Sequence, residues 1–304
     1  MVPPRNLAGA AAARIWENDG RVTPTNPTVY KQYRLESWDE FLKIITGSPY
    51  SNWAFRGHRK EAWPLASALS RYFRVFRIDR RAWPQQEGRI LRVFKRKAHQ
   101  FLAQPPDPDD DFQWLALMQH HGAPTRLLDF TWSPYVSAFF ALDRATSDAA
   151  VWALNPANIS AGGIRRSAKS QKPAVTTRGM DPRRKGNFAR YFLKGDHEFI
   201  WLGEPDTMNR RLIAQSGTFA LPGVLDKPME QIVHQYRDPR DMMAKFILPA
   251  AKVRETGLRE LYRMNITHAT LFPDLDGLAR SLAYELEFHW AYNPRTMESF
   301  RTEE

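Results

Sequence analysis

The spacing of apolar and polar residues along the chain predicts alternating helices and strands. Apolar residues recur between Gln85 and Gln104 at the 3.6-residue spacing of one helix face, and basic residues occupy the opposite face. Strict alternation over residues 52–58 (NWAFRGH) predicts a half-buried strand. In that strand Trp53 and Phe55 share one face, and Arg56 lies on the other.

Capping signals set the expected ends of three further helices. Ser37 and Glu40 form a capping box, and we expect the helix that they open to stop at Gly47. The acidic, Pro-rich connector at 105–111 caps a buried helix over 112–121, which ends at Gly122. Ser133 is a natural N-cap for an apolar helix over 134–144.

The remaining pattern completes an α+β domain. Strands are expected at 151–154, 199–202, 217–221, 245–248 and 268–272, and helices at 252–264 and 275–290. Because no regular βαβ rhythm appears, we expect a single compact domain with a mixed sheet core surrounded by helices. The expected division is a partly disordered arm at 1–32, a domain at 33–290 with a basic loop insertion near 160–186, and a tail at 291–304.

Composition excludes several classes of protein. The 304 residues contain no cysteine, which excludes disulfide-stapled domains, thiolate metal sites and a cysteine nucleophile. No apolar run approaches the roughly 20 residues that span a bilayer, and no signal peptide is recognisable. We therefore expect a cytoplasmic protein that does not bind membranes.

Positive charge is concentrated in two segments. Lys and Arg outnumber Asp and Glu by 44 to 33 in the whole chain. Between Arg71 and Lys97 there are ten basic residues against two acidic ones, and between Arg165 and Lys185 eight against one. Such segments are either solvated faces or contacts for a polyanion, and we expect nucleic acid as a partner of both.

Polar residues cluster between two apolar helices, in the stretch QHHGAPTRLLDFTWSPYVSAFF at 119–140. This loop could mount a functional site. Alternatively, Arg126 and Asp129 form a buried ion pair, while Thr131 and Ser133 cap a helix. The adjacent His120 and His121 point in different directions on a helix, so no metal site is expected. The chain also lacks G-x-S-x-G, Walker A and G-x-G-x-x-G motifs.

Four motifs in order resemble the FRG domain, a family named for its Phe/Tyr-Arg-Gly motif. They are Phe55-Arg56-Gly57 followed by WPL at 63–65 and SR at 70–71, the HHGAPTRLLDFTWSPYVSAFFAL stretch, RLIAQSGTF at 211–219, and LFPDLDGLA at 271–279. The resemblance covers roughly Tyr33 to Leu282. It implies a bacterial or phage protein near mobile or defence genes, such as a toxin–antitoxin or phage-defence component with a neutralising or defence-system protein partner.

A more distant similarity is to ADP-ribosyltransferases of the Arg-Ser-Glu type, and it implies a core of that type with NAD as a substrate. The aromatic-Arg-Gly at 55–57 and the strand-to-helix segment at 130–140 look like the first two elements of that family. The resemblance implies catalytic roles for a cation, hydroxyls and a carboxylate or amide: Arg56, Thr131, Ser133, Asp129, Glu198 and Gln215. It also implies NAD contacts from Arg56, Gly57, His58, His121 and Arg126.

Two functions remain open from the sequence. One is an NAD-dependent ADP-ribosyltransferase that modifies nucleic acid or protein as a toxin or defence effector. The other is a non-catalytic module that senses a nucleotide or nucleic acid. A carboxylate that reaches the pocket formed by Arg56 and Thr131 would distinguish the first from the second, because the transferase needs an acceptor for a ribose hydroxyl.

Overall fold

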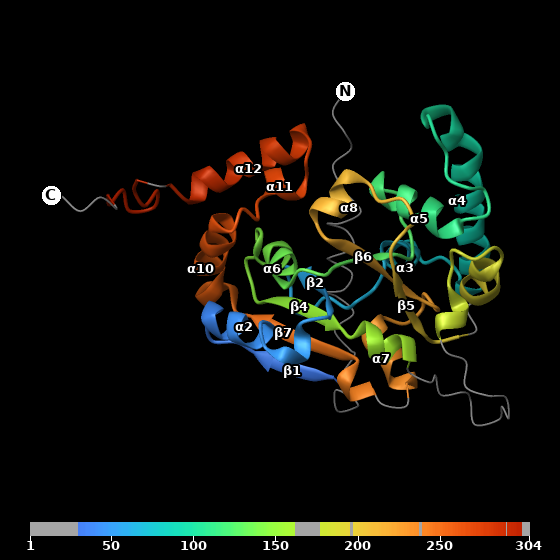
Figure 1. Ribbon diagram of the computed structural model, residues 1–304, viewed down its shortest axis with the longest axis horizontal. Helices are drawn as coiled ribbons and strands as arrows, with labels where there is room; N and C mark the ends of the chain where they lie inside the picture. Colours follow the sequence, from blue (N-terminus) through green and yellow to red (C-terminus); the bar gives the residue numbers. More distant parts are fainter. Residues whose placement is uncertain (1–29, 162–176, 195–196, 237–238, 290, 300–304) are drawn as a thin grey trace.

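A seven-stranded mixed sheet organises the protein (Figure 1). The computed structural model describes residues 30–161, 177–194, 197–236, 239–289 and 291–299. Along the sheet the strands are β1 (Lys31–Arg34), β7 (Met243–Leu248), β4 (Ala149–Leu154), β2 (Ala54–His58), β3 (Leu128–Thr131), β6 (Gly217–Pro222) and β5 (Ile200–Gly203). Among these described strands, only the β1–β7 pair is parallel. The expected mixed sheet with helices is thereby confirmed.

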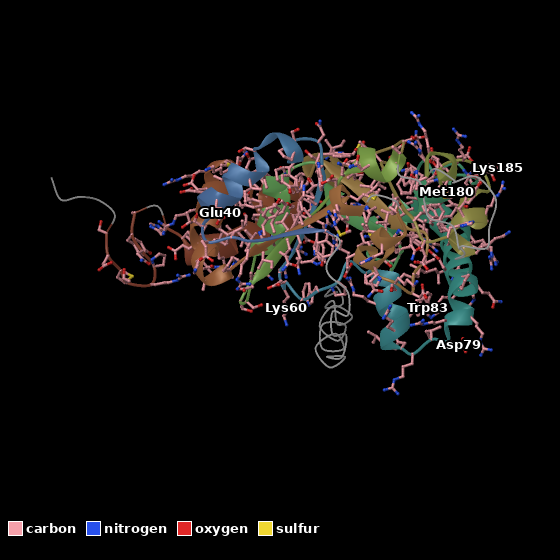
Figure 2. The ribbon with its side chains drawn as sticks, turned by 90° about the horizontal axis from the view of Figure 1, so that it is seen from below. Glu40, Lys60, Asp79, Trp83, Met180 and Lys185 are labelled. Atoms are coloured by element: carbon pink, nitrogen blue, oxygen red, sulfur yellow. The ribbon has the colours of Figure 1, made fainter. Side chains whose placement is uncertain are left out.

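Helices cover both faces of the sheet, with short elements between them. Their bounds are α2 (Trp38–Ile45), α3 (Ala68–Val75), α4 (Trp83–Ala98), α5 (Asp111–His120), α6 (Pro134–Leu142), α7 (Pro156–Ala161), α8 (Arg210–Ala214), α9 (Met229–Ile232), α10 (Ala250–Arg263), α11 (His268–Leu271) and α12 (Leu275–Glu287). Residues Phe188–Leu193 form a π-helix. Figure 2 shows Asp79 and Trp83, before and at the start of α4, at an edge of the molecule far from Glu40 on α2.

Side-chain alternation in the strands divides the core into layers. Phe55, Val151 and Phe246 pack with α2, α6 and α10 on one face. Their neighbours Ala54 and Trp152 belong to a second cluster on the opposite face, with residues of α7 and α9. A third cluster places α4 and α5 against β5 and β6. Figure 1 shows α10 and α4 near opposite ends of the sheet.

Several helix ends lie where their capping residues predicted. The Ser37 hydroxyl accepts a hydrogen bond from the Glu40 amide at 3.1 Å, and the Glu40 carboxylate reaches back to the amide of Glu36. Asp110 caps α5, and Gly122 follows that helix with a φ of +81°. Ser133 accepts from the Val136 amide and opens α6. These ends follow from local hydrogen bonding, which the sequence specifies directly.

Two expectations of secondary structure were wrong or incomplete. Residues 268–272 are not a strand: His268–Leu271 form the short helix α11, because Thr267 and Thr270 make a capping box. The last helix ends at Glu287 rather than at Trp290. The expected arm at 1–32 falls outside the described residues except for its last three positions, as does 162–176 of the basic insertion. No helix within the described ranges is long and apolar enough to cross a bilayer.

Strands β2 and β3 diverge after a single paired position, and this divergence creates the site. Phe55 lies opposite Thr131, whereas β2 pairs with β4 over five positions. Helix α6 crosses β2 at Gly57, where an added Cβ would lie 2.0 Å from the Ser137 carbonyl oxygen. The glycine of the Phe-Arg-Gly motif therefore allows the helix to lie directly on the strand.

Candidate functional site

A cavity of about 420 Å³ opens where β2 and β3 separate. Its walls come from β2 and the segment after it, α3, the end of α5, β3, α6, α8 and the start of β6. The polar lining residues are Arg56, His58, Arg59, Arg71, Gln119, His120, Asp129, Thr131, Ser137, Asn209, Arg211 and Gln215, and the aromatic ones are Phe55, Trp63, Phe130, Phe140 and Phe219. The site thus combines cations with aromatic surfaces.

Arg56 spans the gap between the diverging strands. One terminal nitrogen donates to the Asp129 carbonyl oxygen at 2.5 Å, in the place that a ladder hydrogen bond would have occupied. The same nitrogen lies 3.8 Å from the Asp129 carboxylate. The side chain is only 20% exposed, and this burial lowers the pKa of Arg56 despite the nearby carboxylate. Arg56 nevertheless stays charged, because a guanidinium is effectively always protonated in proteins.

His58 orients the Arg56 side chain through a hydrogen bond. The Arg56 Nε donates to His58 Nε2 at 3.2 Å, so that nitrogen carries the lone pair. The other nitrogen, Nδ1, then donates to the Trp63 carbonyl oxygen at 3.2 Å. Burial, followed by the neighbouring charge of Arg56, lowers the pKa of His58 well below its usual value. The ring is therefore neutral, with its tautomer fixed by its two partners.

Asp129 supplies the carboxylate of the cavity. Its side chain is 58% exposed and accepts a hydrogen bond from Gln119 Nε2 at 3.1 Å. Gln119 is itself fixed, because its Oε1 accepts from the Thr125 hydroxyl at 2.6 Å. The carboxylate is therefore oriented toward the cavity while its remaining lone pairs stay accessible.

Structural hydrogen bonds occupy the side chains of three residues that the sequence predicted to be catalytic: Thr131, Ser133 and Gln215. Thr131 and Gln215 line the cavity, but the Thr131 hydroxyl donates to the Gln215 carbonyl at 2.7 Å and accepts from the Ser133 amide. The Gln215 amide group donates to the Leu271 carbonyl. Ser133 caps α6 and lies outside the cavity lining.

Three other residues expected at the site lie outside the cavity lining. Arg126 is buried, and its ion-pair partner is Glu87 on α4, which corrects the expected pairing with Asp129. Glu198 pairs with Lys227 at 2.6 Å. His121 is exposed and packs its ring against that of His120. Of the remaining expected residues, Gly57 and His58 line the cavity.

Sequence reasoning missed the cations that approach from other elements. Arg71 on α3 and Arg211 on α8 both line the cavity, as does Arg59 after β2. Arg71 and Arg211 both occur within the motifs that resemble the FRG domain. Those motifs did not indicate that the two side chains line the same cavity as Arg56. Among the described residues, no group of three or more His, Asp or Glu side chains could hold a metal ion.

A half-buried acid, Glu230, supports one wall of the cavity and should make stability depend on pH. The Glu230 carboxylate accepts from the Leu65 amide at 3.1 Å, next to the lining residue Pro64. Burial raises the pKa of Glu230 to about 7. The native state therefore holds this proton more tightly than the unfolded chain, and the stabilisation present below pH 4.5 is lost as pH rises through 7.

We expect the Glu230 proton to contribute up to about 3 kcal/mol at low pH. Urea unfolding of wild type and Glu230→Gln at pH 5 and pH 8 measures this contribution. The wild type should lose more unfolding free energy between the two pH values than the variant does. Equal pH dependence of the two proteins would contradict the assignment.

The sheet and its cavity define an α+β domain with a cation-rich cleft at the divergence of two central strands. Residues 51–150 match the family model of the FRG domain, so this part of the chain is an FRG domain. The match runs from the start of β2 into β4 and contains Arg56, Arg71 and Asp129, whereas Arg211 and Gln215 lie beyond it. No curated protein and no solved structure matches the chain significantly.

Proposed function

We propose that the cavity binds NAD and that the protein transfers ADP-ribose to a macromolecule. The observation that carries this proposal is the Asp129 carboxylate, which lines the same cavity as Arg56 and Thr131. A nucleotide sensor would need the cation and the aromatic walls but not an oriented carboxylate beside them. The divergence of β2 and β3 around Arg56 is also compatible with an ADP-ribosyltransferase-like core.

The proposed chemistry assigns one task to each group. The bond between nicotinamide and ribose C1′ breaks, and its electron pair leaves with nicotinamide. A nucleophilic oxygen or nitrogen of the acceptor forms the new bond to C1′ and releases its proton to the solvent. Asp129 accepts a hydrogen bond from a ribose hydroxyl and stabilises the positive charge that develops on the sugar, while Arg56 binds a pyrophosphate oxygen.

Nucleic acid is the acceptor that the charge distribution favours. Helix α4 exposes Arg89, Arg92, Arg96 and Lys97, and within the described part of the chain none of them pairs with an acidic side chain. Such a row of cations attracts a polyanion. Contact with nucleic acid should therefore weaken steeply as salt is added.

Asp129→Asn should reduce nicotinamide release about 100-fold or more while leaving the free energy of unfolding within about 0.5 kcal/mol. The half-exposed carboxylate contributes little to stability, but its charge is needed in the transition state. Labelled NAD is incubated with the full chain alone and with RNA, DNA or cell lysate, and nicotinamide release and label transfer are followed.

Two variants complete this experiment. Arg56→Ala should also abolish turnover, whereas Asp241→Asn removes an exposed carboxylate outside the cavity and should have no effect. If wild type releases no nicotinamide with any acceptor but binds NAD in an Arg56-dependent manner, the protein is a nucleotide-sensing module instead.

A further inference from the structure

The cavity carries more positive charge than its own carboxylate can balance. Four arginines line it, against one acidic residue, Asp129. Arg59 already has a partner outside the lining, because its guanidinium lies 3.1 Å from the Asp143 carboxylate. Arg71 and Arg211 make no ion pair with any described residue. A ligand with at least two negative charges would therefore complement the cavity.

Arg71 is half-buried and makes no ion pair with a described residue. Its terminal nitrogen donates to the Ala66 carbonyl at 3.1 Å, which fixes the side chain but supplies no negative charge. Burial, and then the positive charge of Arg56, lowers the pKa of Arg71 to about 10. Two half-buried guanidiniums that repel each other are unfavourable without an anion between them.

Arg56 is held in a fixed orientation for such an anion. Its Nε is engaged by His58, and one terminal nitrogen by the Asp129 carbonyl. The second terminal nitrogen forms no hydrogen bond with any described residue. Arg56 and Arg71 line the same cavity. Because His58 is neutral, it positions the guanidinium without adding a further cation.

We infer that Arg56 and Arg71 form a pyrophosphate subsite, and that His58 is a positioning residue for Arg56. Planar guanidiniums bind phosphate oxygens through paired hydrogen bonds, which a single lysine could not provide. Arg211 on α8 adds a third cation to the cavity. Its guanidinium stacks on Phe272 with 4.3 Å to the ring centroid. The assignment of this subsite to NAD rests on the proposed function, but the subsite itself can be tested without turnover.

The probe is inorganic pyrophosphate. It is titrated into the full chain at low salt and pH 8, and binding is measured by calorimetry. Arg71→Gln should weaken its binding about 10- to 100-fold. Arg59→Gln is the matched control, since it removes the same charge from the same cavity but from an arginine that is already paired. That control should change the affinity less than about 3-fold.

The role of His58 is tested with two substitutions in the same assay. His58→Gln can still accept from Arg56 and donate to the Trp63 carbonyl, so it should retain pyrophosphate affinity within about 3-fold. His58→Phe fills similar space without an acceptor and should weaken binding about 10-fold. Thermal unfolding of both free variants separates this effect from a general loss of structure.

Each outcome has a defined meaning. Undetectable pyrophosphate binding by wild type, or equal losses in Arg59→Gln and Arg71→Gln, would overturn the subsite. Equal losses in the two His58 variants would overturn its positioning role. Pyrophosphate binding that depends on Arg71, without NAD turnover, would support the subsite and refute the transferase. NAD turnover by Arg71→Gln together with unchanged pyrophosphate affinity would support the transferase and refute the subsite.

Discussion

Replacing Arg126 with methionine should lower the free energy of unfolding by about 3–5 kcal/mol, the largest loss that we expect from a single side chain. Arg126 binds both carboxylate oxygens of Glu87, and it also donates to the carbonyls of Pro222, Gly223 and Phe192. Both members of the ion pair are almost completely buried. The variant would leave a buried negative charge and three carbonyl groups without their donor.

Urea unfolding measures this loss, and two further variants interpret it. Arg81→Met removes an exposed arginine that pairs with Asp79 at 2.7 Å, and it should cost less than about 1 kcal/mol. Arg126→Met combined with Glu87→Leu should be more stable than Arg126→Met alone, because the stranded carboxylate is gone. A loss below 1 kcal/mol for Arg126→Met would show that the ion pair does not hold α4 to the sheet.

Gly57→Ala should destabilise the protein by about 3 kcal/mol or more, because the helix covering the motif lies against the backbone of β2. The added Cβ would lie 2.0 Å from the Ser137 carbonyl oxygen and 2.6 Å from the Ala141 amide nitrogen. Both are backbone atoms of α6, so the strain can be relieved only by shifting the whole helix. Such a shift would also displace Arg56 and widen the cavity.

The matched control for this substitution is Gly179→Ala. A Cβ at Gly179 would meet no atom within 4 Å, and its φ is not in the positive range. We therefore expect a change of less than about 0.5 kcal/mol there. Equal stability of the two alanine variants, measured by urea unfolding, would show that α6 adjusts to the larger side chain. The glycine of the motif would then have no packing role.

Local signals predicted most helix boundaries well, but they misassigned one segment as a strand and missed strand β1. The cap at Ser37, the stop at Gly122 and the start of α6 depend on hydrogen bonds within a few residues, and the sequence contains all the participants. Residues 268–272 failed as a strand because a short apolar run fits a helix equally well. Strand β1 was not expected, because its pairing with β7 joins segments more than 200 residues apart.

The candidate site shows the same division between local and long-range information. Arg56 and Asp129 were recognisable as chemical groups from their motifs, but the hydrogen bond between the Arg56 guanidinium and the Asp129 carbonyl depends on where β2 and β3 separate. The Arg126–Asp129 pair was a reasonable expectation from proximity in sequence. It was wrong because Glu87, 39 residues away, packs closer in space.

By itself the sequence determined the α+β class, most helix ends and the presence of an FRG domain, because periodicity, caps and motifs are short-range properties. The tertiary structure alone decided which charges share the cavity. Arg71 and Arg211 reach it from α3 and α8, which have no sequence relation to β2. Packing also decided which arginines have carboxylate partners, and it leaves Arg71 and Arg211 in the cavity without an acidic partner among the described residues.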